Sequence, residues 1–489
     1  MSQVSSLRKP DLSIKTFDLL IKGKWVKPKF GEYATDIDPA DESAIALVAE
    51  ASEADVDDAV LAARTALVGW SKMRASERGK ILMRFADLME KRQEELIALE
   101  SRDCGKPINA VRRQDMPAVL DTIRYYAGWA DKINGAVIPT RSDALTYTVR
   151  EPVGVVAAIV PWNFPLMIGM WKIAPALACG CTLVVKPSEI TPLSMLLTAE
   201  IALEAGIPPG VFNVLPGRGT VAGEALVRHL GVDKVTFTGS PGVGRKIMRN
   251  ASVNFKRVTL ELGGKSANVI FDDADLDMAV HAAASGIFFN TGQVCSAGSR
   301  ILVQRTIYDN VVKRLTERTQ SIKVGSPDKA DTAMGPLVSA QQMATVLNYI
   351  GVGKSEGAEI ATGGVRLGTN GFYVAPTVFT QVEHEMRISQ EEIFGPVACV
   401  IPFEDEADAI RIANGTVYSL AAGLWSKDIS RVHRVAQSIK AGTVWVNTYG
   451  FTDVRLPWGG AGDSGLGREH GDVALENFTE PKVVWLSLR

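Results

Sequence analysis

The feature that most constrains the fold of this chain is a regular alternation of short strands and helices between residues 153 and 264. Five segments there are rich in β-branched residues and closed by Gly, Pro or Ser, which predicts buried strands. They are VGVVAAIVP (153–161), CTLVVKP (181–187), VFNVLPG (211–217), KVTFTGS (234–240) and RVTLELGG (257–264). Helices are expected between them, at about 166–178, 191–205, 220–230 and 242–250. The alternation predicts a parallel sheet with helices packed on its faces, and ligands of such a sheet bind beyond the carboxyl ends of its strands.

The remainder of the chain predicts further units. A length of 489 residues suggests about three domains. Apolar residues recur at helical spacing from Asp55 to about Asp103, and another helix is expected at 117–130. A second α/β domain is predicted by a helix at about 275–289 and by strands at 300–304, 397–403 and 442–447.

Composition excludes several classes of function. The 53 Lys and Arg nearly balance the 55 Asp and Glu, so a large nucleic-acid-binding surface is not expected. Five cysteines in so long a chain do not form a disulfide framework, and with only five histidines a metal site is not expected either. The N-terminus is polar, without the apolar core of a signal peptide, and no apolar stretch is long enough to span a bilayer. These features predict a cytoplasmic protein with reduced thiols.

Polar residues stand at the expected carboxyl ends of the first two strands. Asn163 in PWNFP (161–165) could belong to a rigid turn, or its amide could stabilise an oxyanion in a dry pocket. Lys186 and Glu189 in KPSE (186–189) could be surface charges, or they could hold ribose hydroxyls. The second role would favour NAD over NADP, because a carboxylate repels a 2′-phosphate.

The fourth and fifth strands end in glycine-containing segments. FTGSPGVG (237–244) opens a helix, and its glycines either form a tight turn or let the backbone approach a phosphate. It is not the G-x-G-x-x-G pattern of dinucleotide-binding sites. In LELGGKS (260–266), Glu261 lies within an apolar strand, where a carboxylate is costly to bury unless it is used or paired. Burial raises the pKa of a carboxyl group, which suits a general base near neutral pH.

Cys295 lies in a segment unlike those of the other cysteines. A free cysteine is often only a small buried apolar residue, and this reading is preferred for Cys179, Cys181 and Cys399. The residues of GQVCSAGSR (292–300) show no apolar periodicity, so the segment is not a packed core face. A glycine-flanked loop between two domains would expose the Cys295 thiol to a substrate.

Taken together, these segments resemble the aldehyde dehydrogenase superfamily, and more loosely its betaine-aldehyde and aminoaldehyde branch. The shared motifs, in the order of the family, are PWNFP, KPSE, FTGS, LELGGKS, GQVCSAGSR, EEIFGP (391–396) and PWGGAGDSGLGRE (457–469). The resemblance covers residues 16 to 486. It implies an α/β fold with a Rossmann-like parallel-sheet NAD(P)-binding domain (1–131 and 152–263) and a second α/β catalytic domain (264–465). It also implies a small β oligomerisation arm (132–151 and 466–489).

The resemblance implies NAD(P)-dependent oxidation of an aldehyde to a carboxylic acid. Cys295 would be the nucleophile, Glu261 the general base, and Asn163 an oxyanion donor together with the Cys295 backbone N–H. Lys172 would belong to a supporting proton network. The cofactor, NAD with NADP possible, would be bound by Ile159, Pro161, Trp162, Lys186, Ser188, Glu189, Gly219, Gly223, Phe237, Gly239, Ser240, Val243, Leu262, Gly263, Glu392 and Phe394.

The family's substrate tunnel would here be lined by Phe164, Met167, Trp171, Phe289, Tyr449, Phe451, Arg455 and Trp458. Aromatic walls suit an apolar or aromatic aldehyde, and they also suit a quaternary ammonium held by cation–π contacts. Arg455 would instead favour a carboxylate, or it could be solvated. The aldehyde therefore stays open.

Alternative functions are a coenzyme A-acylating semialdehyde dehydrogenase and a catalytically silent structural relative. Acylating relatives typically lack a carboxylate at the position of Glu261, and a silent relative would tolerate loss of Cys295 or Glu261. The segments 145–152 and 482–489 alternate like strands and could pair with each other or with another subunit. By resemblance they imply a homodimer or homotetramer.

Overall fold

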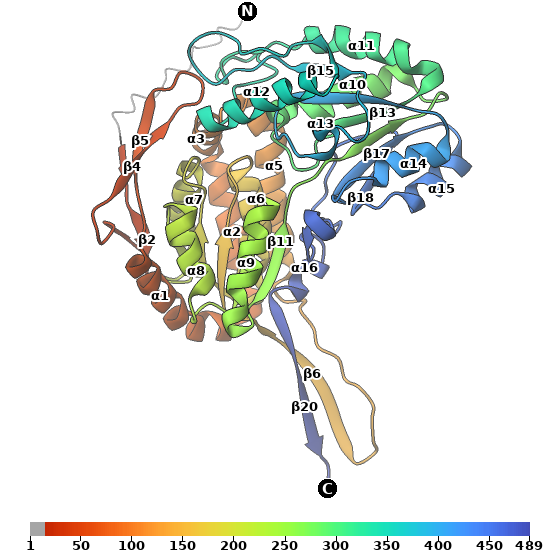
Figure 1. Ribbon diagram of the computed structural model, residues 1–489. Coiled ribbons are helices and arrows are strands. Elements are labelled where there is room, and N and C mark those ends of the chain that lie inside the picture. Colours follow the sequence, from red (N-terminus) through yellow and green to blue (C-terminus); the bar gives the residue numbers. More distant parts are fainter. Residues whose placement is uncertain (1–14) are drawn as a thin grey trace, which may run out of the picture.

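The computed structural model describes residues 15–489, which form two large sheets and two small ones (Figure 1). Residues 1–14, the start of the predicted 1–131 segment, lie outside the described residues. The first large sheet has the strand order β19-β11-β10-β7-β8-β9-β2-β3. Its strands are β2 (Leu19–Ile21), β3 (Lys24–Val26), β7 (Val155–Ile159), β8 (Thr182–Lys186), β9 (Phe212–Val214), β10 (Lys234–Thr238), β11 (Arg257–Glu261) and β19 (Gly465–Leu466).

The five strands predicted between residues 153 and 264 are confirmed as β7 to β11. They run parallel to one another, so their carboxyl ends meet at one edge of the sheet. The antiparallel strands β2, β3 and β19 extend the sheet on its two sides and were not predicted. They are only two or three residues long, too short for a periodic signal.

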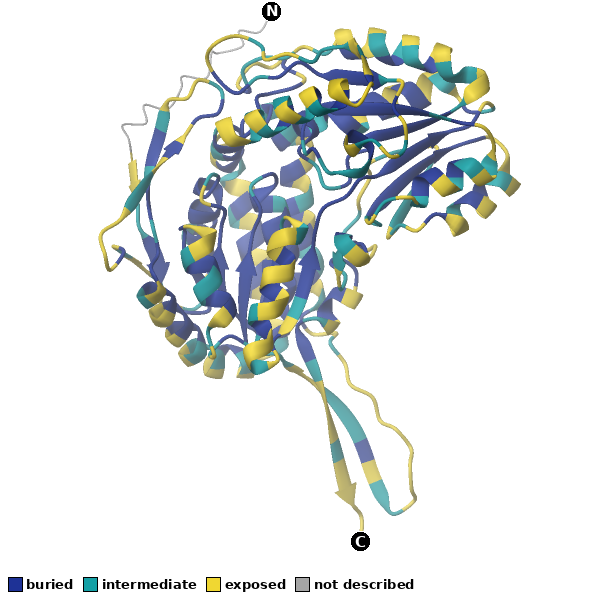
Figure 2. Ribbon diagram, viewed as in Figure 1, coloured by how far each residue is buried: buried dark blue, intermediate teal, exposed yellow. Residues whose placement is uncertain are grey.

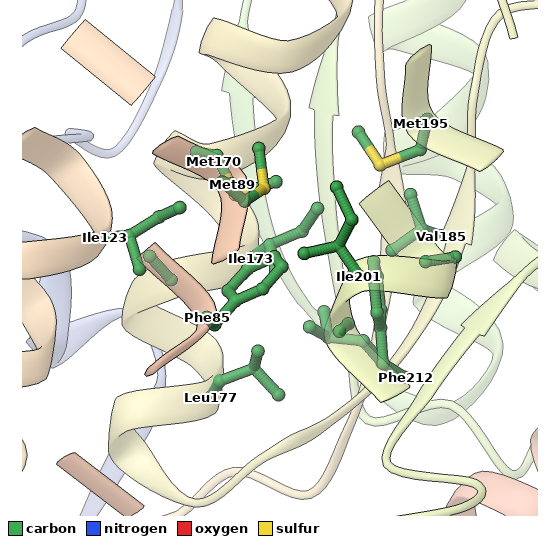
Figure 3. Packing of buried hydrophobic residues seen from close by; sticks show 14 of the residues in the cluster. Phe85, Met89, Ile123, Met170, Ile173, Leu177, Val185, Met195, Ile201 and Phe212 are labelled. Atoms are coloured by element: carbon green, nitrogen blue, oxygen red, sulfur yellow. The ribbon is translucent and has the colours of Figure 1, made fainter. Parts of the chain in front are cut away.

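Successive residues of the central strands pack against different helix layers, as the two-residue period of a strand requires. On β7, Val156 and Ala158 face the layer of α2, α5, α6 and α7, while Val155 and Ala157 face α1, α8 and α9. Figure 3 shows the first of these cores, and Figure 2 shows that the strands between the layers are buried. The helices are α1 (Glu53–Lys72), α2 (Ala75–Lys91), α3 (Gln93–Cys104), α5 (Met116–Trp129), α6 (Pro165–Cys179), α7 (Leu193–Glu204), α8 (Glu224–Arg228) and α9 (Pro241–Ala251).

The second large sheet has the order β14-β15-β16-β13-β12-β17-β18 and is parallel except for β14. Its strands are β12 (Ala267–Ile270), β13 (Arg300–Gln304), β14 (Glu359–Thr362), β15 (Thr377–Thr380), β16 (Val397–Phe403), β17 (Ala421–Trp425) and β18 (Thr443–Val446). The predicted strands correspond to β13, β16 and β18. Its larger helices are α10 (Leu276–Phe288), α11 (Tyr308–Gln320), α12 (Ala340–Ser355), α14 (Glu406–Asn414) and α15 (Ile429–Ser438).

A two-stranded arm projects from the body (Figure 1). It consists of β6 (Ala144–Pro152) and β20 (Thr479–Ser487), which pair antiparallel along their whole length. The two strand-like segments of the sequence therefore pair with each other within the chain. A separate small sheet contains β1 (Lys15–Phe17), β4 (Tyr33–Ile37) and β5 (Ala44–Ala49). The predicted domain limits remain a prediction.

Within residues 15–489, none of the helices combines the length and the apolar character that crossing a membrane requires.

Candidate active site

The carboxyl ends of β7 to β11 carry most of the predicted cofactor residues along one edge of the first sheet. The strand-end set consists of Ile159, Pro161, Trp162, Lys186, Ser188, Glu189, Phe237, Gly239, Ser240, Leu262 and Gly263. Gly219 and Gly223 bound η2 (Gly219–Gly223) after β9, and Val243 lies in the first turn of α9. The parallel register therefore collects these residues at one edge.

Two features of this edge suit the parts of a dinucleotide. Ser240 is the N-cap of α9 and accepts a hydrogen bond from the Val243 backbone N–H, yet both residues are exposed. The N-terminus of α9 thus offers N–H donors and a positive dipole end, which suits a phosphate. Lys186 is buried and pairs with the exposed Glu189 at 2.8 Å. Partial burial opposes the charge of Glu189, but Lys186 together with the backbone N–H groups of Glu189 and Gly219 outweighs it, so the pKa of the carboxyl group is lowered.

Glu392 and Phe394 reach this edge from the segment that precedes β16. Glu392 accepts a hydrogen bond from the Gly264 backbone N–H at 3.0 Å. A Cβ atom on Gly263 would lie 2.3 Å from the Glu392 carboxylate, so only glycine permits this approach. The Phe394 ring meets the Trp162 ring edge to face at 5.1 Å. The described residues therefore fit a nucleotide cofactor held between the two sheets.

The loop that carries Cys295 is held by close contacts rather than by regular secondary structure. Asn290 and Thr291 adopt left-handed backbone conformations, and a Cβ on Gly292 would meet the Gly395 carbonyl oxygen at 2.0 Å. A Cβ on Gly264 would lie 2.3 Å from the Cys295 carbonyl oxygen. The end of β11 and the Cys295 loop are thus in direct backbone contact.

Asn163 joins the first strand end to the same loop. Its side-chain Nδ2 donates to the Gln293 carbonyl at 2.8 Å, and Asn290 Nδ2 donates to the Asn163 carbonyl at 3.1 Å. An amide nitrogen has two N–H groups, so one remains for a ligand. Asn163 is buried, which makes a donated hydrogen bond stronger than in water.

Cys295 is half-buried, and its thiol has a raised pKa. Burial is the largest cause, and the nearby carboxylates of Glu392 and Glu261 add to it, giving a pKa of about 12. The backbone N–H groups of Ser296 and Cys295 act in the opposite direction. The resting group is therefore a thiol, and it needs a base before it can act as a nucleophile.

Glu261 is a nearby carboxyl group that suits the role of this base. Its side chain is buried, and its Oε2 has no hydrogen-bond partner among the described residues. Burial, followed by the charge of Glu469, raises the pKa of Glu261 well above its usual value, while Lys172 and Arg468 lower it. A carboxyl group with a raised pKa and an oxygen free of hydrogen bonds is suited to exchange protons close to neutral pH.

Lys172 forms a buried ion pair with Glu469 behind Glu261. Lys172 lies on α6 and is fully buried, and Glu469 follows β19. The family resemblance implies a proton network for Lys172, whereas Glu469 stands out in the sequence only as the last residue of the PWGGAGDSGLGRE motif. The position of Glu469 within this motif does not indicate that its side chain would face α6.

Mainly aromatic residues, from α6 and from the segments that follow α10 and β18, form an apolar cluster with Cys295. Six of the eight predicted substrate residues belong to it, namely Phe164, Met167, Trp171, Phe289, Tyr449 and Trp458. The rings of Phe164 and Phe289 are 6.3 Å apart, and those of Trp171 and Trp458 are 6.2 Å apart. Tyr449 also donates its hydroxyl to the Ser296 carbonyl at 2.8 Å and so supports the Cys295 loop.

Phe451 and Arg455 lie outside this cluster. Phe451 is 74% exposed. The Arg455 side chain is 73% exposed and forms a two-pronged ion pair with Asp453, with distances of 2.8 and 2.5 Å. Arg455 lowers the pKa of Asp453 to about 2. The Asp453 carboxylate in turn neutralises the positive charge of Arg455, which a carboxylate substrate would need.

Sequence reasoning missed two aromatic neighbours of the cluster. Trp445 on β18 packs 4.8 Å from Tyr449 and 6.1 Å from Trp458. His470 lies 4.3 Å from Trp171, and burial lowers its pKa to about 4. Trp445 stands on the predicted strand GTVWVN, so its place near a strand end was a usable signal. His470 follows a loop and had none.

In the part of the chain that the structure describes, all five cysteines are free, and no cluster of three or more His, Cys, Asp or Glu could hold a metal ion.

The fold and the site together fit an α/β oxidoreductase with a half-buried thiol between the carboxyl edge of the first sheet and an aromatic cluster. The sequence pattern of the aldehyde dehydrogenase family matches residues 25–484. An aldehyde dehydrogenase from Emericella nidulans is 51% identical over 95% of this chain and 94% of its own length. Human retinal dehydrogenase 2 is 46% identical over 98% of this chain and 93% of its own.

Solved structures give the same result. The NAD+ complex of an aldehyde dehydrogenase from Bacillus cereus has a TM-score of 0.96 and 48% identity, covering 97% of each chain. A betaine aldehyde dehydrogenase from Staphylococcus aureus, in complex with NAD+, has a TM-score of 0.95 and 43% identity over 96% of this chain and 95% of its own. The chain belongs to the aldehyde dehydrogenase family, and it is an enzyme of NAD(P)-dependent aldehyde oxidation.

Proposed function

We propose that the enzyme oxidises an aldehyde to a free carboxylic acid through a covalent intermediate on Cys295. The observation that carries this proposal is the position of a thiol between the Asn163 amide, the Glu261 carboxyl group and the cofactor edge. An aldehyde carbon is electrophilic, and a thiolate is the most effective protein nucleophile for it. Glu261 takes the thiol proton, and Cys295 attacks the carbonyl carbon.

The oxyanion that forms receives hydrogen bonds from Asn163 Nδ2 and the Cys295 backbone N–H. Such preorganised donors stabilise the transition state most in a buried site. When bound, the nicotinamide ring supplies the acceptor for the hydride that leaves the tetrahedral carbon. Glu261 then activates a water molecule that releases the acid from the Cys295 thioester, while Lys172 and Glu469 support its proton exchange. The buried Glu261 carboxyl group favours this hydrolysis over transfer to coenzyme A.

We propose NAD as the preferred cofactor. The Glu189 carboxylate, held by Lys186, suits the two hydroxyls of an adenine ribose and disfavours a 2′-phosphate. Ser240 and the N-terminus of α9 would face the pyrophosphate, and Trp162, Glu392 and Phe394 would enclose the nicotinamide ribose. Ser188, Gly219, Gly223 and the other strand-end residues complete the cleft.

The substrate is proposed to be an uncharged aldehyde with an apolar or aromatic body. The aromatic cluster is made of apolar side chains, and the Lys106 ammonium group that lies 3.7 Å from the centre of the Phe164 ring is neutralised by its ion pair with Asp115. Steady-state NADH absorbance with benzaldehyde, hexanal, betaine aldehyde and a semialdehyde acid tests this. Benzaldehyde and hexanal should have the highest kcat/KM. A preference for betaine aldehyde would show that cation–π contacts dominate the cluster.

Arg455→Ala is expected to change kcat/KM by less than about twofold for all four aldehydes, because an exposed ion pair contributes little. Arg455 is paired with Asp453 outside the cluster. A selective loss with the semialdehyde acid would contradict this and would make Arg455 a carboxylate-binding residue.

We further propose a cytoplasmic homo-oligomer joined through the arm. Several large apolar side chains of β20 and its end are exposed in the single chain, namely Val483, Trp485, Leu486 and Leu488. Apolar groups on a projecting hairpin are stabilised when a second subunit covers them. Light scattering is expected to give a dimer or tetramer, and Trp485→Glu is expected to shift it toward smaller species. A monomeric wild type would refute the proposal.

A further inference from the structure

A line of buried polar side chains extends from the active site through the first sheet. We call Lys234, Thr236, Thr259, Glu469 and Lys172 the polar file. Thr236 on β10 stands opposite Thr259 on β11, so the two share one face of the sheet. Lys234 Nζ donates to Thr259 Oγ1 at 3.1 Å, Thr236 Oγ1 donates to Glu469 Oε1 at 3.4 Å, and Glu469 pairs with Lys172.

Lys234 is the one ionisable residue of the polar file that has no role in the proposed mechanism. Its side chain is fully buried, and its ammonium group lies 5.1 Å from the centre of the Phe478 ring. An amine is costly to bury in its charged form. Burial lowers the pKa of Lys234 to about 7, against a smaller opposite effect of Glu469. Near neutral pH, Lys234 can therefore take up or release a proton.

The position of Lys234 also sets it apart from the cofactor edge. It begins β10, whereas Glu261 stands level with Thr238 at the other end of that strand. Four residues of a strand span roughly 13 Å. Phe478 immediately precedes β20, so the polar file runs from the general base toward the side where the arm leaves the body (Figure 1).

We propose that Lys234 is a positioning residue that gains a proton when Glu261 loses one, so that the buried cluster keeps its net charge. The carboxyl group of Glu261 becomes a carboxylate, the amine of Lys234 becomes an ammonium, and the threonine hydroxyls and the Lys172–Glu469 pair lie between them. No oxidant or co-reactant is consumed. This inference rests on the proposed role of Glu261 as general base.

Few other ionisable groups influence Lys234. Those with an effect on its charge are Glu469, Lys172, Cys181 and Arg257. Burial raises the pKa of Cys181 to about 12, so this thiol stays neutral. Arg257 pairs with Glu480 at the exposed start of β11. The charged neighbours of Lys234 are therefore Glu469 and Lys172 of the polar file and Arg257 at the start of β11.

The test is the pH profile of steady-state kcat in Lys234→Met and Lys234→Arg. Without an amine, ionised Glu261 adds an uncompensated negative charge, and the acidic limb should move to higher pH by about one unit. A permanent positive charge at this position should move it to lower pH. The NADH burst amplitude should stay unchanged in both. Lys256→Met is the matched control, because Lys256 precedes the neighbouring strand β11 but contacts Asn254 instead of the polar file.

A second pair of variants tests the link without removing the amine. Thr259→Val deletes the hydroxyl that accepts from Lys234 and should shift the limb like Lys234→Met, whereas Thr259→Ser should retain the wild-type profile. If Lys234→Met does not fold, the two Thr259 variants test whether Lys234 is linked to Glu261. An unchanged profile in Thr259→Val, or shifts of the same sign in both Lys234 variants, would overturn the inference. Glu261→Gln separates the two claims. If this variant retains steady turnover, Glu261 is not the general base. If it loses steady turnover while the Lys234 variants show an unshifted pH profile, only the inference about Lys234 is rejected.

Discussion

Glu261→Gln is expected to keep a first turnover of NADH and to lose the steady rate by about 10²- to 10⁴-fold, the usual contribution of a general base. Glutamine cannot activate the water that releases the acid from Cys295. The first turnover persists because Cys295 and Asn163 are intact, and a thiolate can form slowly by loss of its proton to solvent. Rapid mixing with excess NAD, followed at the NADH absorbance, measures both phases.

The fold of this variant should be preserved. Glutamine has the same shape as glutamate, and Glu261 Oε2 has no hydrogen-bond partner among the described residues, so the replacement breaks no hydrogen bond of that oxygen. Thermal unfolding is expected to show a Tm near that of the wild type. Full steady-state activity of Glu261→Gln would remove Glu261 from the mechanism.

Cys295→Ala is expected to abolish the burst as well as the steady rate, with a loss of at least about 10⁴-fold. Without the sulfur no covalent intermediate forms, and the aldehyde hydrogen is not positioned to leave as hydride. NAD binding, followed by quenching of Trp162 and other tryptophans, should remain, since the cofactor edge does not depend on the thiol.

Cys399→Ala is the matched control for loss of a thiol. Cys399 is fully buried on β16 and donates to the Ile388 carbonyl. Its removal should lower the free energy of unfolding by about 1 kcal/mol and leave the burst intact. An NADH burst that survives in Cys295→Ala, or that is lost in Cys399→Ala, would show that Cys295 is not the nucleophile.

The local order of the first sheet was predictable because the segments of β7 to β11 are short, rich in β-branched residues and closed by Gly, Pro or Ser. That is the pattern of a strand buried between two helix layers. The extensions β2, β3 and β19 were not predictable, since two or three residues carry no period and join the sheet only through distant contacts. The same holds for Phe451 and Arg455, whose nearness in sequence to Trp458 did not bring them into the aromatic cluster.

The sequence by itself determined the chemical groups of the site, since a lone non-periodic cysteine, a carboxylate in an apolar strand and polar strand ends can be read from local patterns. Only the tertiary structure decided how they act on one another. The pKa of Cys295 and of Glu261 depends on burial and on charges that come from distant segments, such as Glu392 and Glu469. Desolvation and Coulomb interactions are set by distance in space, and distance in space is what a linear sequence does not contain.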